Sequence, residues 1–413
     1  MKRPLKVKTL QEARLEFSKY WEPSRLIEKV SLREASGRIL AEDVKSKIDL
    51  PPFDRSIYDG YAVKAEDTFG AEEDDPVTLQ LKGKILAGQK PDIGIDSNEC
   101  VEISTGAPMP DSADAVVMVE DTSIDDGKVK VRSAVSLKEN VSEKGSELQK
   151  GDNVATAGTE LSPQVYGSLL ACGIEYVKVY RKPQVGIISI GEELVDVGSE
   201  LELGEIYDVN GPTLTKAVED CGCLSFYQGI LHDDIEEMEK EIENSLADFD
   251  VVITSGGTSA GSSDFLPEVL ENLGDPGIIV HGLAQKPGKP TVMAIVKNKP
   301  IFGLPGYPVS ALMVFYQVVA PYLREMSGKP ALERKMVEAR LPRKITSEAG
   351  RKELVPVSLS EEDGNKIATS LRRGSGAITS LSKSDGYFVV PLNIEIIDSD
   401  EIVDVELFGW VLL

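Results

Sequence analysis

The chain has 413 residues, of which 41% are hydrophobic and 28% charged; this is the composition of a globular protein, and the length predicts two to four domains at roughly 100–200 residues each. Its formal net charge is −24, from 45 Lys and Arg against 69 Asp and Glu, so it repels phosphate backbones and anionic lipid, which excludes nucleic acids and membrane surfaces as expected partners. No apolar run approaches the roughly 20 residues of a membrane helix, and the polar N-terminal stretch lacks the apolar core of an export signal, so we expect a cytoplasmic protein.

The first part of the chain changes character near residue 49. Apolar residues recur close to helical spacing across 10–41, which predicts helix there, with Pro23 as an interruption. After residue 49, short apolar stretches alternate with Gly, Pro and Asp turns and predict a β-rich module without long helices. A helix is expected next at 162–172, with Pro163 in its first turn. The strands expected in the β-rich module cover residues 77–81, 99–103 and 115–119.

Strands and helices alternate between residues 182 and 328. This order and spacing predict a parallel, doubly wound sheet that is covered by helices on both faces. The expected strands cover residues 184–190, 224–231, 250–254 and 299–304, and the expected helices cover 211–220, 233–247 and 308–326.

After residue 328 the apolar stretches are again short and bounded by turns. They predict a small C-terminal β-sandwich or β-barrel. The expected strands cover residues 337–341, 354–359, 367–371, 387–391 and 402–407. The expected fold class of the whole chain is therefore multidomain, α/β plus β.

Three acids are placed to share one edge of the predicted parallel sheet. Glu193, Asp233 and Asp264 each follow a strand, and loops at the carboxyl ends of parallel strands gather where ligands bind. Each acid also has an ordinary interpretation, because an acid at a helix start such as Asp233 most often caps the helix. The convergence of all three on one edge favours a ligand site.

Two glycine-rich loops are expected at the same edge, SGGTSAG at 255–261 and GLPGYP at 303–308. Glycines let backbone N–H groups approach phosphate oxygens, and a following helix start adds a favourable field. Carboxylates beside phosphate are a usual arrangement for magnesium, so we expect Mg²⁺ here. Lys286 and Lys289 in KPGKP can neutralise an oxyanion or a phosphate, unless they are simply solvated. The candidate substrate-binding residues are Ser255, Gly256, Gly257, Ser259, Gly261, Lys286, Lys289, Pro305, Gly306 and Pro308.

Cysteine and histidine usage predicts no further site. The four cysteines show no CxxC spacing, which is typical of buried thiols in a reducing compartment rather than of a disulfide framework. Cys221 and Cys223 lie close together but have no Cys/His cluster near them, so zinc is not expected.

Seven strings, in this order and spacing, resemble the MoeA and gephyrin E-domain family: PPFDRSIYDGYAV, STGAPMPDSADAVV, GEEL, GEIYDVN, SGGTSAGSSD, KPGKPT and GLPGYPVSAL. The ordered set covers almost the whole chain. The resemblance implies four domains: a discontinuous N-terminal domain (1–46 with 145–181), a β-rich inserted domain (47–144), an α/β molybdopterin-binding domain (182–328) and a C-terminal β-barrel (329–413).

The resemblance also implies a function in molybdenum cofactor biosynthesis. Members of the family insert molybdate into adenylylated molybdopterin, release AMP and use a divalent cation such as Mg²⁺; tungstate is an alternative oxyanion. They are elongated homodimers whose active site lies between the third domain of one subunit and the second domain of its partner. The molybdopterin adenylyltransferase is a further expected partner.

Carried over position by position, five residues match catalytic positions of the family. Asp59 of DGYAV and Thr105 of TGAP match residues of the second domain, which the partner subunit supplies. Glu193, Asp233 and Asp264 match the acids of the third domain. The resemblance implies that Asp233 and Asp264 bind the metal and the pyrophosphate, and that Glu193 shapes the pterin side.

The chain departs from the family pattern at three places, one of which is Ser262-Ser263, where a more acidic or aromatic pair is usual before Asp264. Pro305 and Pro308 match the prolines of PGxP, but Tyr307 stands where many members have Asn. Residues 141–147 replace an Arg-rich stretch, and Glu147 stands where Asp is usual. These changes put in doubt how phosphate is gripped there, and they are compatible with tungstate as the oxyanion or with a diverged paralogue.

Two other functions stay open from the sequence. One is the preceding step, the adenylylation of molybdopterin, although its stand-alone enzymes resemble the third domain alone. The other is a dimeric scaffold that binds another protein and has no transferase activity. Three carboxylates on one cleft edge favour an enzyme, because a scaffold does not need them.

Overall fold

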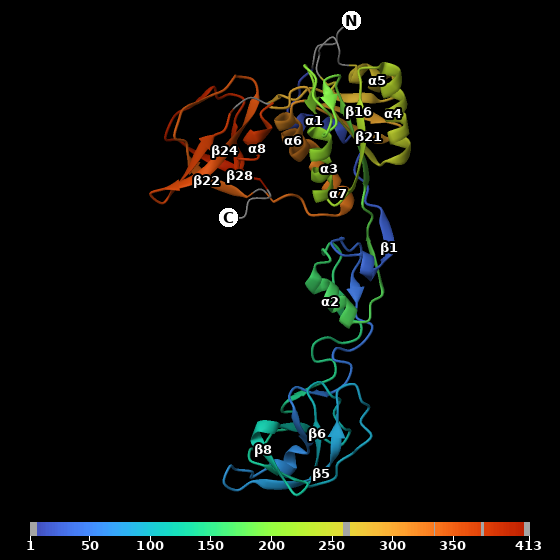
Figure 1. Cartoon of the computed structure of the whole chain (residues 1–413), viewed down its shortest axis with the longest axis vertical. Coiled ribbons are helices and arrows are strands. Elements are labelled where there is room, and N and C mark those ends of the chain that lie inside the picture. Colours follow the sequence, from blue (N-terminus) through green and yellow to red (C-terminus); the bar gives the residue numbers. More distant parts are fainter. Residues whose placement is uncertain (1–5, 259–264, 334, 373–375, 409–413) are drawn as a thin grey trace. The chain divides into compact units, whose positions relative to one another are not determined.

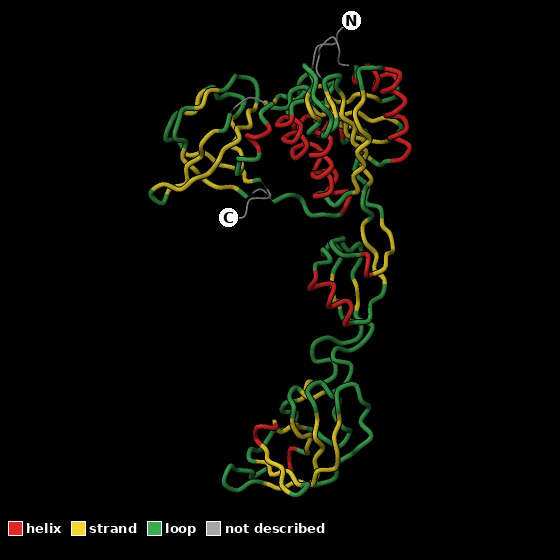
Figure 2. Tube along the Cα trace, viewed as in Figure 1, coloured by secondary structure: helices red, strands yellow, loops and turns green. Residues whose placement is uncertain are grey.

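The computed structural model describes residues 6–258, 265–333, 335–372 and 376–408. The chain divides into two compact units, Met1–Glu28 with Tyr180–Leu413 and Lys29–Val179, and Figures 1 and 2 show the helices and strands of each. Within the described residues, none of the helices combines the length and the apolar character that crossing a membrane requires.

A six-stranded sheet forms the centre of the first unit. In order across the sheet, its strands are β16 (Leu224–Leu231), β13 (Gln184–Ile190), β17 (Val251–Ser255), β21 (Lys299–Leu304), β20 (Val292–Val296) and β18 (Gly277–His281). The first four are parallel, as predicted, whereas β20 pairs antiparallel with β21, and β18 pairs antiparallel with β20. Lys297 and Asn298, both with positive φ, connect β20 to β21, and such a two-residue turn makes a hairpin.

Helices cover both faces of this sheet (Figure 1), which confirms the doubly wound arrangement. Alternate residues of one strand face opposite layers, so Ile187 packs into one core and Ile188 into the other. The helices of the first layer are α1 (Leu10–Phe17), α3 (Asn210–Asp220), α6 (Pro308–Val314) and α7 (Ala320–Ser327), and those of the second layer are α4 (Ile235–Asp248) and α5 (Leu266–Asn272).

The helix predicted over 308–326 is interrupted by a π-helical turn, η4 (Phe315–Val319), between α6 and α7. Pro321 in the first turn of α7 has no N–H to offer the preceding turn. The carbonyl oxygen of Gln317 instead accepts a hydrogen bond from the guanidinium of Arg14 on α1. A contact far along the chain therefore compensates for the interruption.

The helix predicted over 10–41 is wrong beyond Phe17. After α1 the chain forms a strand, β1 (Ile27–Ser31), which pairs with β12 (Tyr176–Tyr180). Pro23 cannot continue the helix because it lacks an N–H. The partner strand is remote in sequence, so the apolar spacing of the segment alone did not reveal it.

The C-terminal residues form a closed barrel, which decides the predicted choice between sandwich and barrel. Its strands follow the order β24 (Lys352–Glu362), β25 (Asn365–Ser370), β22 (Met336–Arg340), β28 (Ile402–Leu407) and β26 (Gly386–Val390). Strand β26 also pairs with β24, and this pairing closes the ring. Val355, Phe388 and Val405 fill its interior.

The second unit is rich in β-structure, as predicted. The strands of its largest sheet are β7 (Ala115–Met118), β4 (Gly60–Val63), β6 (Glu99–Ile103), β5 (Val77–Ile85), β9 (Lys128–Val131) and β8 (Thr122–Asp125), in this order. The predicted helix with Pro163 in its first turn is α2 (Pro163–Ala171), and the side chain of Ser162 caps it.

Candidate functional site

The carboxyl ends of β16, β13, β17 and β21 lie at one edge of the sheet, because these four strands are adjacent and parallel. Glu193 therefore shares this edge with Asp233, Gly256 and Pro305, each of which follows one of these strands. The structure thus brings together the described members of the predicted set in the first unit. Ser259, Gly261 and Asp264 lie outside the described residues.

Asp233 is held beside an acid that the sequence interpretation passed over. Its backbone N–H donates to Oε1 of Glu192 at 2.7 Å, and Oε2 of Glu192 lies 3.7 Å from Nδ1 of His232. Glu192 and the predicted acid of this loop, Glu193, are both exposed. A second carboxylate directly after the strand was the only sequence signal for Glu192.

The capping interpretation belongs to Asp234 rather than to Asp233. Asp234 is the N-cap of α4, and its carboxylate accepts a hydrogen bond from the N–H of Glu237 at 2.9 Å. Asp233 is half-buried just before this cap. Asp233 is therefore not the helix cap, and its predicted role at the site stays a prediction.

The glycines that follow β17 serve first to pack loops together. Gly256 has φ +102°, and a Cβ there would lie 2.1 Å from the carbonyl oxygen of Ile190. The N–H of Gly256 already donates to the carbonyl of Leu304 at 3.0 Å. We predicted that this N–H would face a phosphate; the structure shows that it joins the β17 loop to the end of β21.

Asp59 and Thr105 lie together in the second unit. Oδ1 of Asp59 accepts a hydrogen bond from the backbone N–H of Thr105 at 2.8 Å, and both residues are exposed. Two strands position them, because Asp59 directly precedes β4 and Thr105 follows the paired strand β6. The two residues that the sequence predicted from separate motifs thus form one small polar group.

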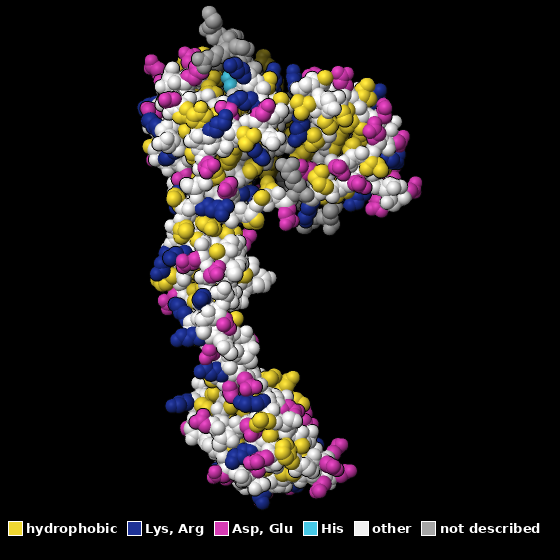
Figure 3. Space-filling view, turned by 180° about the vertical axis from the view of Figure 1, so that it is seen from behind, with side chains coloured by type: hydrophobic (Ala, Val, Ile, Leu, Met, Phe, Trp, Pro, Cys, Tyr) yellow, Lys and Arg dark blue, Asp and Glu magenta, His cyan; other side chains and the backbone are white. Residues whose placement is uncertain are grey.

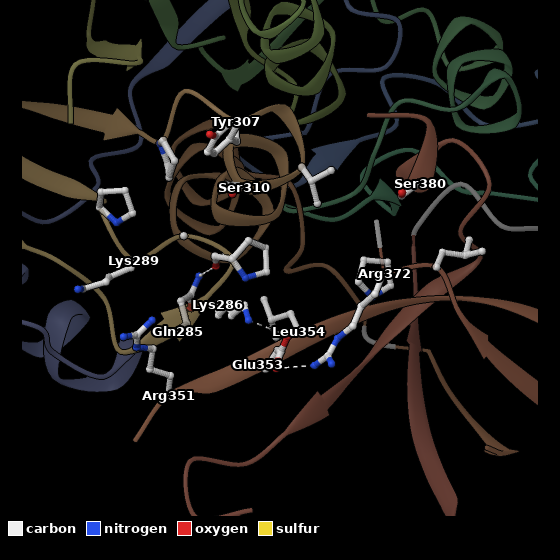
Figure 4. A pocket seen from close by; sticks show the side chains of 17 residues that line it. Gln285, Lys286, Lys289, Tyr307, Ser310, Arg351, Glu353, Leu354, Arg372 and Ser380 are labelled. Atoms are coloured by element: carbon white, nitrogen blue, oxygen red, sulfur yellow. Dashed lines mark hydrogen bonds and ion pairs between the residues drawn. The ribbon is translucent and has the colours of Figure 1, made fainter. Parts of the chain in front are cut away.

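The KPGKP segment lines a cavity of about 510 Å³ in the first unit. A short strand, β19 (Gln285–Lys286), pairs in parallel with β24 of the barrel and places Lys286 opposite Glu353. The cavity lies where this segment and the start of α6 face the barrel, and Figure 4 shows the side chains that line it.

Among the described residues, the side chains that line this cavity include four basic ones, Lys286, Lys289, Arg351 and Arg372, and one acid, Glu353. Acidic and basic side chains are interspersed over the face in Figure 3, and acids outnumber bases in the chain as a whole, whose net charge is −24. The excess of positive charge in the cavity therefore stands out against the rest of the molecule. Such a cavity favours an anionic ligand.

Glu353 contacts two of the basic side chains of the cavity, Arg372 and Lys286. It is only 5% exposed, and its carboxylate accepts a hydrogen bond from Oγ of Ser347 at 2.6 Å and forms an ion pair with the Arg372 guanidinium at 2.5 Å. Nζ of Lys286 lies 3.8 Å from the same carboxylate, as the dashed lines in Figure 4 show. A buried carboxylate needs such partners to offset its lost hydration.

Among the described residues, two buried polar atoms in the wall of the cavity have no hydrogen-bond partner. They are Oε1 of Gln285 and Oγ of Ser380, in residues that are 2% and 5% exposed. Buried polar atoms are normally paired, so these two are exceptions in the packing of the cavity wall. The sequence interpretation found neither of them, nor the two arginines, because all four belong to segments without a recognised motif.

The described residues contain no group of three or more His, Cys, Asp or Glu side chains that could hold a metal ion. The four cysteines are unpaired and buried, and burial raises the pKa of the Cys100 and Cys221 thiols to about 12. These thiols are therefore structural, as the sequence predicted.

Three family models match successive parts of the chain. The MoeA N-terminal region (domain I and II) matches residues 8–173, the "Probable molybdopterin binding domain" matches residues 186–325, and the MoeA C-terminal region (domain IV) matches residues 338–408.

Relatives with the same organisation are known as sequences and as structures. The molybdopterin molybdenumtransferases of Haemophilus influenzae and Bacillus subtilis are 38% and 32% identical to this chain, over 78% and 88% of it and 78% and 85% of their own lengths. Two crystal structures of molybdopterin biosynthesis MoeA proteins from Pyrococcus horikoshii have TM-scores of 0.83 and 0.75 at 39% and 32% identity. Both cover 98% of this chain and 100% of their own.

Proposed function

Because the chain belongs to the MoeA family of molybdopterin biosynthesis proteins, we propose that it acts as a cytoplasmic molybdopterin molybdenumtransferase, which inserts molybdate into adenylylated molybdopterin and releases AMP. The observation that carries this proposal is the basic cavity of the first unit in a chain of net charge −24. The cavity offers positive charge to an oxyanion.

Lys289 is the side chain best suited to grip the oxyanion. It is partly buried in the cavity, and a charge-assisted hydrogen bond is stronger than a neutral one. Lys286 and Arg372 form ion pairs with Glu353, which partly neutralise their charge and fix their positions in the cavity, so they attract the anion less strongly.

The reaction needs positioning and charge neutralisation more than it needs a strong base. Cleavage of a phosphoryl linkage spreads negative charge over phosphate oxygens, and preorganised positive groups stabilise that charge. Lys286 and Lys289 supply such groups on one loop. Asp233 and Glu192, at the carboxyl edge of the sheet, supply carboxylates to the same unit.

We include Mg²⁺ in the proposal. The ion commonly uses one or two carboxylates and completes its shell with substrate phosphate and water, and Asp233 beside Glu192 fits this mode. The second predicted ligand, Asp264, is outside the described residues. When bound, the cation would supply charge neutralisation at the pyrophosphate oxygens.

We also propose that two copies of the chain complete each site. Asp59 and Thr105 belong to the second unit, and the side chains of Phe53, Ile57 and Tyr58 just before them are exposed. Exposed apolar side chains next to a polar pair are typical of a surface that another chain covers. The proposed occupant is the first unit of a second copy. The molybdopterin adenylyltransferase is proposed as the protein that delivers the substrate.

The first test is an AMP-release assay. Purified protein is incubated with adenylylated molybdopterin, Mg²⁺ and either molybdate or tungstate, and both AMP and pterin-bound metal are followed. We expect release that depends on the oxyanion and that Asp233→Asn and Lys289→Gln reduce, with Lys383→Gln, an exposed lysine outside the cavity, as the control. The preferred oxyanion is the one that gives faster release.

The same assay separates the competing functions. An adenylyltransferase would instead consume ATP and molybdopterin and form pyrophosphate. A scaffold would release no AMP with either oxyanion while it remained folded and dimeric. Either of these results would overturn the transferase proposal.

The shared site is tested by mixing two inactive variants. Asp59→Asn and Asp233→Asn are co-expressed with different tags, and the mixed dimer is purified. If each site combines the second unit of one copy with the first unit of the other, the mixed dimer has one intact site of two and regains about half of the wild-type activity. A mixed dimer as inactive as its parents would refute the shared site.

A further inference from the structure

Asp208 is a buried carboxylate that the proposed mechanism does not use. It is 3% exposed and lies in the GEIYDVN motif, just before α3. Its Oδ2 accepts hydrogen bonds from Oγ of Ser189 at 2.8 Å and from the hydroxyl of Tyr227 at 2.7 Å. Burial, and then this carboxylate, raise the pKa of Tyr227, so its hydroxyl remains a donor.

The second oxygen of Asp208 fixes the start of α3. Oδ1 accepts hydrogen bonds from the backbone N–H of Asn210 at 3.0 Å and of Gly211 at 3.2 Å. The N-terminal N–H groups of α3 are therefore satisfied within the chain and are not an anion site. The same bonds hold the backbone of Asn210 at one place on the carboxyl edge of the sheet.

The side chain of Asn210 joins two loops that follow different strands. Its Nδ2 donates to Oγ of Ser255, the last residue of β17, at 2.8 Å, and to the carbonyl oxygen of Gly306, after β21, at 2.6 Å. We call these two hydrogen bonds the Asn210 bridge. The bridge connects the SGGT loop and the PGYP loop, both of which the sequence predicted to bind substrate.

The start of α3 is packed tightly beside the joined loops. Gly211, next to Asn210, admits no Cβ, because one would lie 2.3 Å from the ring of Tyr227. A Cβ on Gly306 would make an ordinary van der Waals contact, at 3.6 Å, with Cα of Gly256, so the two loops lie close to each other. A small shift of the Asn210 side chain would therefore be transmitted to both loops.

We propose that Asn210 is a positioning residue of the transferase site: held by Asp208, it fixes the β17 loop against the β21 loop, and thereby sets where the substrate phosphates bind. This inference rests on the proposed function for its kinetic consequence, while its structural part concerns the free protein. Asn210 acts through the loops, so it is expected to affect substrate binding more than the chemical step.

Two substitutions separate hydrogen bonding from shape. Asn210→Ala removes the side chain, whereas Asn210→Asp keeps its shape but replaces the donor by an oxygen that faces the carbonyl of Gly306. If the donated bonds matter, both variants fail; if only the filled volume matters, Asn210→Asp behaves like the wild type. Lys216→Gln, an exposed change on the same helix, is the control for α3 stability.

The first readout is hydrogen–deuterium exchange in the ligand-free protein. We expect faster exchange in peptides that cover residues 255–258 and 304–308 for both Asn210 variants, and none for Lys216→Gln. Unchanged exchange in both loops would overturn the bridge. If the wild-type protein released no AMP, the proposed function would be refuted, but the exchange experiment would still test the Asn210 bridge, because it uses ligand-free protein. The failure of the proposed function is therefore distinguishable from the failure of the bridge.

The second readout is the kinetics of AMP release. We expect KM for adenylylated molybdopterin to rise about 10- to 100-fold, with a smaller change in kcat, as the loss of two hydrogen bonds implies. Asn210→Asp should recover in part as the pH falls to about 4, where about half of an ordinary Asp is protonated, because a protonated carboxyl regains one of the two donated bonds. The ratio of the KM of Asn210→Asp to that of Asn210→Ala at each pH corrects for the titration of other groups. Faster loop exchange with unchanged KM would refute the positioning role.

Discussion

Replacing Lys289 by Gln removes one positive charge from the basic cavity and nearly preserves the length of the side chain. At about 4 Å, two unit charges attract by about 4 kcal/mol at the effective dielectric constant of about 20 found near protein surfaces. Lys289 is partly exposed, and screening by solvent and salt reduces this to about 2 kcal/mol. The expected result is an oxyanion affinity about 30-fold weaker.

Lys286→Gln should cost less, although the two lysines belong to the same loop. The side chain of Lys286 is 50% exposed, and its Nζ lies 3.8 Å from the carboxylate of Glu353. Part of its charge is therefore already neutralised before a ligand binds. We expect about a 3-fold loss of affinity, or roughly 0.7 kcal/mol.

Calorimetric titration with molybdate and with tungstate, at low and at moderate salt, measures both effects without the pterin substrate. Lys383→Gln is the matched control, because it removes one positive charge from the barrel outside the cavity. Equal losses for the two cavity lysines would refute the argument from Glu353. An affinity unchanged in Lys289→Gln would refute the cavity as the oxyanion site.

Three further predictions concern stability and reactivity. Asp234→Ala should lower the free energy of unfolding by about 1 kcal/mol, because it removes the N-cap of α4, whereas Asp233→Ala should mainly lower the rate of AMP release. Urea titration and the AMP-release assay on both variants test this; a stability loss confined to Asp233→Ala would contradict it. Gly256→Ala should lower the free energy of unfolding by about 3 kcal/mol or more, because φ is positive and the new Cβ would lie 2.1 Å from the carbonyl oxygen of Ile190. Gly106→Ala should lower it by only about 1 kcal/mol, because Gly106 has φ +77° but no atom within 4 Å of the new Cβ. Equal losses in denaturant titration would show that the β17 loop adapts. Burial raises the pKa of Cys100 to about 12, so about 1 thiol in 10,000 is ionised at pH 8. A thiol reagent should therefore label Cys100 at least about 100-fold more slowly in the native protein than in urea. Similar labelling rates would indicate that the structure around Cys100 opens locally.

The individual strands and helices of the α/β domain were predictable because local patterns encode them. The apolar run Gln184–Ile190 is a strand that is buried on both faces, and helices bury apolar residues at a spacing of three to four. Ser162 followed by Pro163 marked the start of α2 for the same local reason. Parallel strands then placed the loops with Glu193, Asp233 and Gly256 at one edge, without any knowledge of contacts.

Predictions failed where a partner remote in sequence decided the structure. The segment Ile27–Ser31 is a strand only because it pairs with Tyr176–Tyr180. The contact of Glu192 with the backbone of Asp233 also joins segments that are remote in sequence, and the sequence analysis did not predict it. The roles of Asp59, Thr105 and Asp264 in catalysis stay predictions.

The sequence by itself determined the order of the elements, the acidic charge and the motifs that identify the family. Only the tertiary structure decided that Arg351, Arg372 and Glu353 meet Lys286 and Lys289 around one cavity. The reason is that β19 and β24 pair in register although their residues are far apart in the chain. Burial of one face leaves a periodic trace in a sequence, whereas the convergence of single side chains from separate segments leaves none.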